Sequence, residues 1–147
     1  MDVFQATGVA VKGRAVLVAG PPGSGKSGLA LSLIDRGAIL IGDDGVCVQA
    51  EGAALIAAPH PRTRGLIEVR NLGLVELPVL DRAPVALLIM FDSAAPRFID
   101  EAETTTIAGI PIPMVRLWPG GDGLALKAEL ALSRYGLPAD CIPVRDN

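Results

Sequence analysis

The chain has 147 residues, of which 50% are hydrophobic and 3% aromatic, and its formal net charge is −3 at pH 7. A net negative charge argues against a non-specific nucleic-acid binder, which needs a basic face. No apolar stretch reaches the roughly 18 residues that would span a membrane, and the N-terminus lacks the basic and apolar regions of a signal peptide. Two isolated cysteines, Cys47 and Cys141, have neither zinc-site nor disulfide spacing. We therefore expect a cytoplasmic protein with no membrane or nucleic-acid partner.

A chain of this length is enough for one domain, whose core must consist of Ala, Val, Leu and Ile because aromatic residues are scarce. Such a core suits a β-rich sheet covered by a few helices. We assign residues 1–136 to this domain and predict a flexible tail at 137–147, where the periodicity ends. The high mean hydropathy of +0.46 also favours an oligomer interface.

The first half of the chain predicts a hairpin, a glycine-rich turn, a helix and further strands. Residues 3–11 alternate loosely between apolar and polar, residues 15–19 are apolar, and the short turn between them indicates a β-hairpin. A helix is predicted over 26–36, and Gly37 ends it. Three short apolar runs separated by turns then predict a β-meander over 38–58.

The second half predicts more strands and one more helix. Residues 59–65 contain two prolines and a glycine and predict a loop. The uniformly apolar run 85–91 is the best candidate for a central strand. Further strands are predicted at 66–70, 72–77, 104–107 and 113–117, irregular segments at 96–103 and 119–123, and a helix at 124–135 capped by Gly136. Together these elements predict an α/β fold with a β-rich mixed sheet, one helix after the glycine-rich turn and one C-terminal helix.

The segment from Gly20 to Ser27 reads G-x-x-x-x-G-K-S, the phosphate-binding P-loop pattern, and it joins a predicted strand to a predicted helix. Glycines let backbone N–H groups turn toward phosphate oxygens, and the helix N-terminus adds donors. Lys26 supplies a charge for the β- and γ-phosphates, and the Ser27 hydroxyl can bind Mg²⁺. The alternative is a chance glycine-rich turn. The predicted nucleotide-binding residues are Gly20, Pro21, Pro22, Gly23, Ser24, Gly25, Lys26, Ser27 and Gly28.

Other polar residues stand among apolar runs and are candidates for the chemistry. Asp43-Asp44 could hold Mg²⁺ or accept a proton from an attacking hydroxyl, but Gly42-Asp43-Asp44-Gly45 is also ordinary turn chemistry. Glu68 could complete a metal shell, and the alternative is a surface ion pair with Arg70. Arg97 could neutralise phosphoryl charge, although a lone arginine in a loop more often faces solvent.

The order of these motifs resembles the C-terminal catalytic domain of HPr kinase/phosphorylase. That family has a P-loop, then Arg-Gly followed by an Asp-Asp pair, then an L-x-E-x-R-G-x-G segment. The matching residues here are Gly20–Ser27, Arg36-Gly37, Asp43-Asp44 and Leu66–Gly73, and Ile110–Pro113 resembles the family's V-P-x-P strand start. The resemblance covers nearly the whole chain and implies a fold of the HPr kinase/phosphoenolpyruvate carboxykinase type. The short length resembles the compact form found in alphaproteobacteria.

The resemblance implies an ATP- and Mg²⁺-dependent serine kinase that phosphorylates the phosphocarrier protein HPr and can also remove the phosphate by phosphorolysis. By position in the family's pattern, Lys26 would hold the β- and γ-phosphates, and Ser27 and Glu68 would bind magnesium. Asp44 would be the catalytic aspartate, with Asp43 beside it, and Arg97 would be a catalytic arginine. The family assembles as hexamers, so we expect a homo-oligomer.

Two departures from the family's pattern bear on the reaction. Gln5 stands where the family usually carries a histidine, and glutamine cannot titrate although it can still form hydrogen bonds. The family's basic P-V-[RK]-x-G-R-N loop matches poorly to residues 117–123, which carry no positive charge. We therefore predict a kinase with weak or absent phosphorylase activity. The alternatives are a catalytically weakened nucleotide-binding regulator and a small-molecule kinase, although the chain leaves little room for the pocket or lid that the latter needs.

Overall fold

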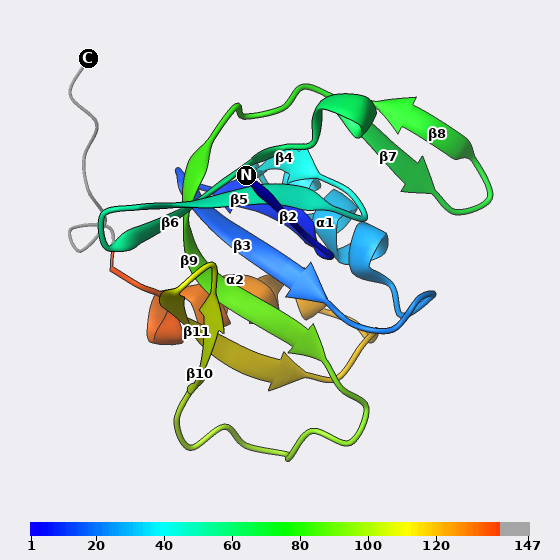
Figure 1. Ribbon diagram of the computed structural model, residues 1–147. Helices are drawn as coiled ribbons and strands as arrows, with labels where there is room; N and C mark the ends of the chain where they lie inside the picture. Colours follow the sequence, from blue (N-terminus) through cyan, green and yellow to red (C-terminus); the bar gives the residue numbers. More distant parts are fainter. Residues whose placement is uncertain (139–147) are drawn as a thin grey trace.

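A computed structural model of the chain describes residues 1–138 (Figure 1). The longest strand has nine residues and the longer of the two α-helices has twelve. In chain order the elements are β1 (Asp2–Phe4), β2 (Thr7–Val11), β3 (Arg14–Ala19), α1 (Lys26–Asp35), β4 (Ile39–Gly42), β5 (Val46–Glu51), β6 (Ala54–Pro59), a 3₁₀ turn (Pro61–Thr63), β7 (Leu66–Val69), β8 (Gly73–Glu76), β9 (Ala83–Phe91), β10 (Glu103–Ile107), β11 (Ile110–Leu117) and α2 (Leu124–Tyr135).

Most strands belong to one nine-stranded sheet, in which β9 is central. The main path runs β1-β5-β6-β9-β3-β2-β4, and β11 also pairs with β9 and carries β10. Both β3 and β11 pair with β9 in parallel, whereas the first residues of β9 pair with β6 in antiparallel fashion. The predicted hairpin of β2 and β3, the central position of β9 and the mixed sheet are all confirmed. β7 and β8 form a separate two-stranded sheet that projects at the upper right of Figure 1.

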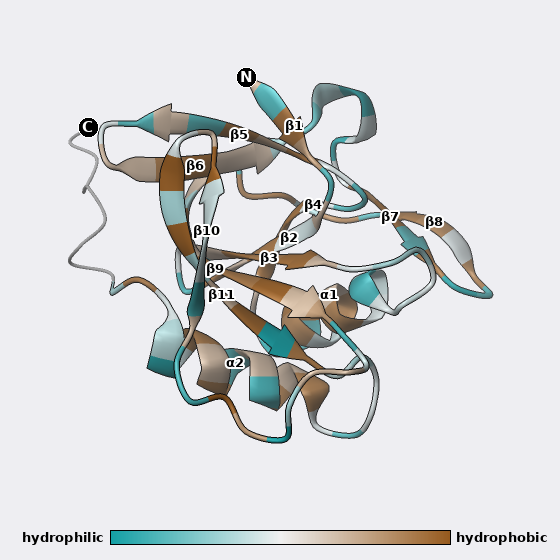
Figure 2. Cartoon of the chain, turned by 60° about the horizontal axis from the view of Figure 1, so that its bottom comes forward, coloured by the Kyte–Doolittle hydropathy of each residue, from teal (hydrophilic) through white to brown (hydrophobic). Residues whose placement is uncertain are grey.

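The central strands bury side chains on both of their faces. Val16 and Val18 of β3 lie in the core that also contains residues of α1 and α2. Ala15, Leu17 and Ala19, which point the other way, lie in the core shared with β5, β6 and β11. Because both faces are covered, β3 is apolar at every position from Ala15 to Ala19 and not only at alternate ones. Figure 2 shows the consequence, since brown dominates the central strands while teal patches mark the exposed side of α2.

Glycines mark the ends of both helices, and the predicted helices are confirmed. Gly37, directly after the C-cap of α1, has a φ of 109°. At the end of α2, a Cβ on Gly136 would stand 2.6 Å from the carbonyl oxygen of Leu132, so no larger residue fits there. The two helices are linked by Arg36, which donates hydrogen bonds of 3.0 and 2.8 Å to the carboxylate of Glu129.

The predicted meander over 38–58 is wrong in its strand pairing. β5 and β6 do form a hairpin, but β4 pairs with β2, and β5 pairs with β1. The cause is the turn between β4 and β5, where the N–H of Gly45 donates to the carbonyl of Ala6 at 2.9 Å and directs the chain to a new neighbour. The predicted strand 3–11 is likewise divided into β1 and β2, with a bend at Gln5 and Ala6.

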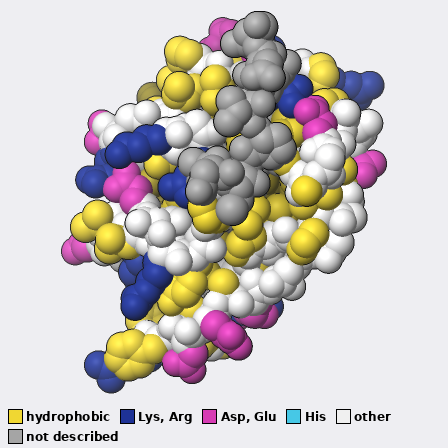
Figure 3. Space-filling model, turned by 90° about the vertical axis from the view of Figure 1, so that its left-hand side faces the viewer, with side chains coloured by type: hydrophobic (Ala, Val, Ile, Leu, Met, Phe, Trp, Pro, Cys, Tyr) yellow, Lys and Arg dark blue, Asp and Glu magenta, His cyan; other side chains and the backbone are white. Residues whose placement is uncertain are grey.

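The chain remains attached to the sheet after α2. The N–H of Leu137 donates to the carbonyl of Ala86 at 2.9 Å, and Arg14 donates to the carbonyl of Leu137 at 3.0 Å. Residues 139–147 of the predicted tail lie outside the described residues. Within residues 1–138, no helix is long and apolar enough to cross a membrane. Side chains of both charge signs are interspersed with apolar ones on the face that Figure 3 shows.

Candidate active site at the P-loop edge

The P-loop leaves the sheet at the edge where the parallel strands β3 and β9 both end. Ala19 pairs with Met90, so Gly20 and Phe91 are the next residues at this edge. A Cβ on Gly20 would stand 2.9 Å from the Cβ of Phe91, which explains why the chain needs glycine at this exit. Ligands of α/β proteins bind outside the carboxyl ends of parallel strands, and this edge therefore has the right location for a ligand site.

The loop is largely exposed, at Pro21, Pro22, Gly23 and Gly25. Gly23 and Gly25 have φ angles of 77° and 100°, which residues with a Cβ adopt only at a cost. α1 starts directly afterwards at Lys26, and no side chain caps its N-terminus. The first N–H groups of a helix have no partner within the helix, so they can bind an anion here.

Two side chains of the loop suit a phosphate ligand. The Lys26 ammonium donates to the carbonyl oxygens of Gly20 at 2.9 Å and Pro21 at 3.2 Å, and so lies across the loop. The hydroxyl of Ser24 is buried, and it has no hydrogen-bond partner among residues 1–138. A buried polar group without a partner costs about 1–3 kcal/mol. A phosphate oxygen accepting from this hydroxyl would remove that cost.

Asp43 is a buried carboxylate that connects three other segments of the chain. Its Oδ1 accepts hydrogen bonds from the Ser27 hydroxyl at 2.7 Å and from the Thr7 hydroxyl at 3.0 Å. Its Oδ2 accepts from the backbone N–H of Glu68 at 3.0 Å. Only 9% of the Asp43 surface is exposed. The carboxylate therefore joins α1, β2 and β7 beside the P-loop. In P-loop NTPases, an aspartate and the P-loop serine or threonine together hold Mg²⁺, and Asp43 lies beside Ser27 in a comparable way.

Asp44 has a different environment from its neighbour. It is exposed, has a φ of 55°, and forms no hydrogen bond in the described part of the chain. The turn is tight, because a Cβ on Gly42 would stand 2.8 Å from the carbonyl oxygen of Gly45. The segment is thus a real turn, and the turn separates the two carboxylates. Asp43 points inward to Ser27, and Asp44 stays accessible to a substrate.

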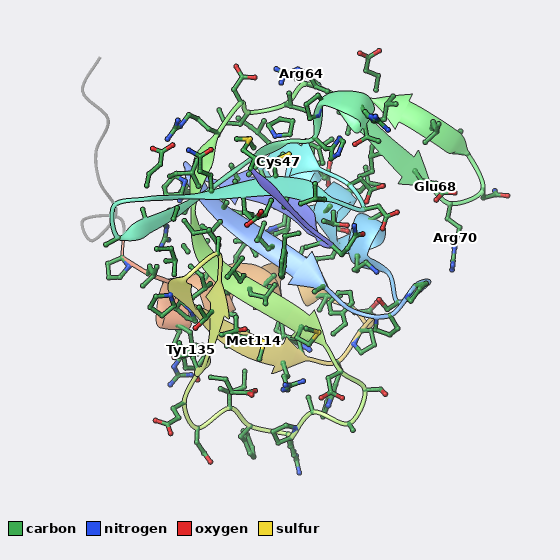
Figure 4. All side chains as sticks on the ribbon, viewed as in Figure 1. Cys47, Arg64, Glu68, Arg70, Met114 and Tyr135 are labelled. Carbon is green, nitrogen blue, oxygen red and sulfur yellow. The ribbon has the colours of Figure 1, made fainter. Side chains whose placement is uncertain are left out.

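The β7–β8 hairpin brings two further charged residues to the P-loop. The backbone of Glu68 is fixed to Asp43, while its side chain is exposed. The Nη2 atom of Arg70 lies 3.6 Å from the position that a Cβ on Gly23 would occupy. Figure 4 shows Arg70 extending from the end of β7 toward the turn between β3 and α1. Glu68 and Arg70 form no ion pair with each other in the described structure, so the alternative of a surface pair is wrong.

Two predicted residues lie apart from this cluster. Gln5 is exposed, and its side chain forms no hydrogen bond to either aspartate within residues 1–138. Arg97 is exposed in the segment after β9, where its guanidinium stands 5.6 Å from the ring centre of Phe98. No hydrogen bond or ion pair of the described residues joins Arg97 to the P-loop. Arg97 instead lines a pocket of about 280 Å³, the α2 pocket, together with Phe98, Trp118, Lys127, Arg134 and Tyr135.

The structure adds Thr7 to the site, a residue that the sequence analysis passed over. Its side chain is 1% exposed in a strand that is otherwise Gly, Val and Ala. A hydroxyl in an otherwise apolar strand indicates a buried polar contact. The partner of that hydroxyl could be identified only from the pairing of the strands. Gly8 pairs with Gly42 in the β2–β4 ladder, and this register places Thr7 beside Asp43.

Comparisons with known proteins agree with this architecture. Residues 3–82 match the family described as the HPr Serine kinase C-terminal domain. An HPr kinase/phosphorylase of Clostridium botulinum is 31% identical over 92% of this chain and 50% of its own length. One of Limosilactobacillus reuteri is 30% identical over 86% of this chain and 44% of its own length. The chain therefore spans about half the length of these curated relatives. The solved structure of the Hpr(Ser) kinase/phosphatase from Coxiella burnetii superposes with a TM-score of 0.80 at 26% identity, covering 90% of this chain and 89% of that one.

Proposed function

The chain belongs to the HPr serine kinase C-terminal domain family, and from this membership we propose that it is an ATP- and Mg²⁺-dependent kinase that phosphorylates a serine of the protein HPr. The observation that carries the proposal is the 2.7 Å hydrogen bond between Ser27 of the P-loop and the buried carboxylate of Asp43. This contact links the phosphate-binding loop to a polar cluster at the same edge of the sheet. A nucleotide held by the loop would therefore have carboxylates beside its terminal phosphates.

The residues of the loop would bind and orient ATP. Its backbone N–H groups and the Ser24 hydroxyl would donate to phosphate oxygens. Lys26 would exchange its two carbonyl acceptors for the β- and γ-phosphates, because an ammonium attracts a charged phosphate oxygen more strongly than a neutral carbonyl oxygen.

Asp44 would act on the acceptor serine. The exposed carboxylate would accept the proton of the serine hydroxyl while that oxygen forms a bond to the γ-phosphorus and the bond to ADP breaks. Asp43 is unsuited to this task because three donors already occupy its oxygens and it is buried. The turn between Gly42 and Gly45 thus gives two adjacent aspartates two different roles.

The donor set also fits a magnesium ion. Hard cations prefer oxygen ligands, and Ser27, Asp43 and Glu68 carry a hydroxyl and two carboxylates. The Ser27 hydroxyl and the backbone N–H of Glu68 both donate to Asp43, so the three residues are neighbours. When bound, Mg²⁺ neutralises phosphate charge during transfer. The short Ser27–Asp43 contact holds the two ligands together in readiness for the ion.

Residues at the other family positions favour the forward reaction over phosphorolysis. Gln5 cannot carry a proton, and residues 117–123 lack the basic side chains of the family's loop. We infer weak or absent phosphorylase activity, a cytoplasmic location and a homo-oligomer of the family's hexameric kind. Incubation of serine-phosphorylated HPr with inorganic phosphate tests the first of these, since rapid pyrophosphate release would contradict it.

Transfer of labelled phosphate from ATP to the host's HPr tests the main proposal. We expect wild type to label HPr, and we expect Asp44→Asn to abolish labelling while ATP affinity stays unchanged. Asp81→Asn is the matched control, because Asp81 is an exposed carboxylate paired with Arg64 on the surface. A wild-type protein that binds ATP but labels no HPr would support the nucleotide-binding regulator instead. Labelling of a small hydroxyl compound in place of HPr would support the small-molecule kinase.

A further inference from the structure

The α2 pocket carries a cluster of positive charge that no acidic side chain of its own lining neutralises. The lining contains no aspartate or glutamate, but it contains four cationic residues, Arg97, Arg116, Lys127 and Arg134. Arg116 is paired with acidic neighbours outside the lining, whereas the other three form no ion pair within residues 1–138. The chain as a whole has a formal net charge of −3, so the pocket is a local excess of cations. A bound anion would offset the repulsion among them.

Two of the aromatic rings of the pocket are held in place by hydrogen bonds. The Nε1–H of Trp118, just after β11, donates to the carbonyl of Ala95 at 2.7 Å. The hydroxyl of Tyr135, the last residue of α2, donates to the carbonyl of Ile99 at 3.1 Å. Both bonds tie the segment between β9 and β10 to the other walls of the pocket. The site is therefore formed before any ligand arrives, which reduces the ordering cost of binding.

The pocket offers apolar surface as well as charge. Leu117 and Ala131 are buried in its lining, whereas Phe98 and Leu130 are 74% and 61% exposed. Ligand sites are typically lined by apolar and aromatic side chains with a few polar groups, and this lining has that composition. The volume of about 280 Å³ lies just below the range of pockets that hold drug-sized ligands, so it suits a ligand with a single ring.

The three unpaired cations rest against aromatic rings in the described structure. Lys127 stands 5.9 Å from the ring centre of Trp118, Arg134 stands 5.9 Å from that of Tyr135, and Arg97 contacts Phe98 in the same way. A cation on an exposed ring is held less strongly than a cation hydrogen-bonded to an ionised group. Lys127 and Arg134 are seven residues apart on α2, so they lie on the same side of the helix. An anion in the pocket can therefore accept hydrogen bonds from both.

The pocket is separate from the phosphate-binding loop. None of its lining residues belongs to the segment 20–28, and no hydrogen bond of the described residues joins the two regions. Arg97 is the residue that the family pattern places at the reaction. Lys127 and Arg134 are therefore the cations on which a second ligand site depends.

We propose that the α2 pocket binds a small aromatic anion, a single ring that carries a phosphate or carboxylate group. The ring lies among the aromatic side chains, and the anionic group accepts hydrogen bonds from Lys127 and Arg134. The proposal concerns binding alone, and no bond is made or broken. It goes beyond the reaction at the P-loop and does not depend on it.

The fluorescence of Trp118 reports a ligand in the pocket directly, because Trp118 is the chain's single tryptophan and lines the pocket. We expect phenyl phosphate or benzoate to quench this fluorescence along a saturation curve, and the two probes show whether phosphate or carboxylate is preferred. Inorganic phosphate and phenol each carry only one half of the first probe. Each should bind at least about tenfold more weakly than phenyl phosphate, because both halves contribute to affinity. Equal affinity for phenol and phenyl phosphate would overturn the proposal, and so would the absence of saturable quenching by both aromatic anions.

Substitutions of the two cations on α2 locate the probe. We expect Arg134→Ala and Lys127→Ala each to weaken the preferred probe about threefold to tenfold, since each removes a charged contact at a partly open site. The double variant should show no saturable quenching. Arg62→Ala is the matched control, because Arg62 is an exposed arginine in the 3₁₀ turn, and it should bind the probe as wild type does. Arg134 and Lys127 are exposed, so the thermal unfolding midpoints should equal that of wild type and exclude misfolding.

A last pair of measurements separates the pocket from the P-loop, which also suits anions. Lys26→Ala removes the ammonium of the P-loop and should leave quenching by the probe unchanged. Saturating ATP with Mg²⁺ should likewise fail to displace the probe from wild type. Loss of quenching in Lys26→Ala, or displacement by ATP, would place the probe in the P-loop and overturn the proposal. Unchanged affinity in the double variant of Lys127 and Arg134 would overturn it as well.

Discussion

Three parallel strands, β3, β9 and β11, end at the same edge of the sheet, but the loops that follow them build two unlike regions. The loop after β3 is the P-loop, whose cluster depends on glycine backbone and on one buried carboxylate, Asp43. The segments after β9 and β11 meet α2 and form the α2 pocket, where cations lie over aromatic rings, as Lys127 does 5.9 Å from the Trp118 ring centre. The first region is held by hydrogen bonds to one buried carboxylate. The second is held by partly exposed side chains, which include the hydrogen bonds from Trp118 to the carbonyl of Ala95 and from Tyr135 to the carbonyl of Ile99.

This difference predicts how each region responds to substitution. Removal of a buried hydrogen-bonded group leaves its partners without a replacement, whereas water replaces an exposed contact at little cost. Changes at the P-loop edge should therefore affect both stability and transfer. Changes at the α2 pocket should affect neither strongly, unless the pocket contributes to the nucleotide site.

The largest effect is expected for Asp43→Ala. The variant leaves the Thr7 hydroxyl, the Ser27 hydroxyl and the Glu68 N–H without their acceptor. We expect a loss of about 1–3 kcal/mol in unfolding free energy for each donor that stays buried, measured by urea denaturation. Transfer to HPr should fall about a hundredfold or more, as when a metal site loses a supporting group. Asp81→Ala, an exposed carboxylate, is the control, and equal behaviour of the two variants would contradict the role of Asp43.

A smaller effect is expected for Ile67→Ala at the base of the hairpin. Ile67 is 0% exposed and packs in the core beside α1, so the substitution should lower the unfolding free energy by about 2–5 kcal/mol. Leu74 lies on the opposite face of the same hairpin and is 71% exposed, which makes Leu74→Ala the matched control. Denaturation that separates the two variants by less than about 1 kcal/mol would mean that the hairpin is not anchored through Ile67.

The elements that depend on neighbouring residues were predicted correctly from the sequence. The turn between β3 and α1, both helices and the apolar run of β9 are encoded in neighbouring residues, and the structure confirms them. The partner of β4 was not predictable in this way, because it depends on the hydrogen bond from Gly45 to Ala6, 39 positions away by their numbers. Thr7 was missed for the same reason, since its contact with Asp43 exists only in the β2–β4 register. The proximity of Arg70 to Gly23 was also not predictable, because it depends on how the β7–β8 hairpin packs against the P-loop.

A weak effect is expected for Lys127→Ala in the α2 pocket. The substitution removes the cation from the Trp118 ring, and an exposed contact of this kind contributes about 0.5–1 kcal/mol. Trp118 is the chain's single tryptophan, so its fluorescence should change while the ATP affinity stays that of wild type. A lower ATP affinity in this variant would show that the α2 pocket takes part in nucleotide binding and would remove the contrast between the two regions.

The smallest effect is expected at the ion pair between α1 and α2, and it should depend on pH. The hydrogen bond from Arg36 and its charge lower the pKa of Glu129 below the ordinary value of 4.5, while partial burial opposes the shift. A lowered pKa in the folded state means that the ionised form favours folding, so the contribution is present above about pH 4.5 and is lost as the pH falls through the folded-state pKa. Wild type should therefore be slightly more stable than Glu129→Gln at pH 7, and the difference should disappear in acid.

Thermal unfolding of wild type and Glu129→Gln between pH 7 and pH 3 measures this difference. The effect should be small and should shrink in high salt, because both side chains are partly exposed to solvent, at 46% for Arg36 and 26% for Glu129. Glu76→Gln is the control, since Glu76 is an exposed glutamate outside the ion pairs of the described chain. A difference that persists at pH 3 cannot come from the Glu129 charge. It would mean that the aliphatic part of the Glu129 side chain joins the two helices by packing. An exposed contact would then matter for stability, unlike the exposed contacts of the α2 pocket.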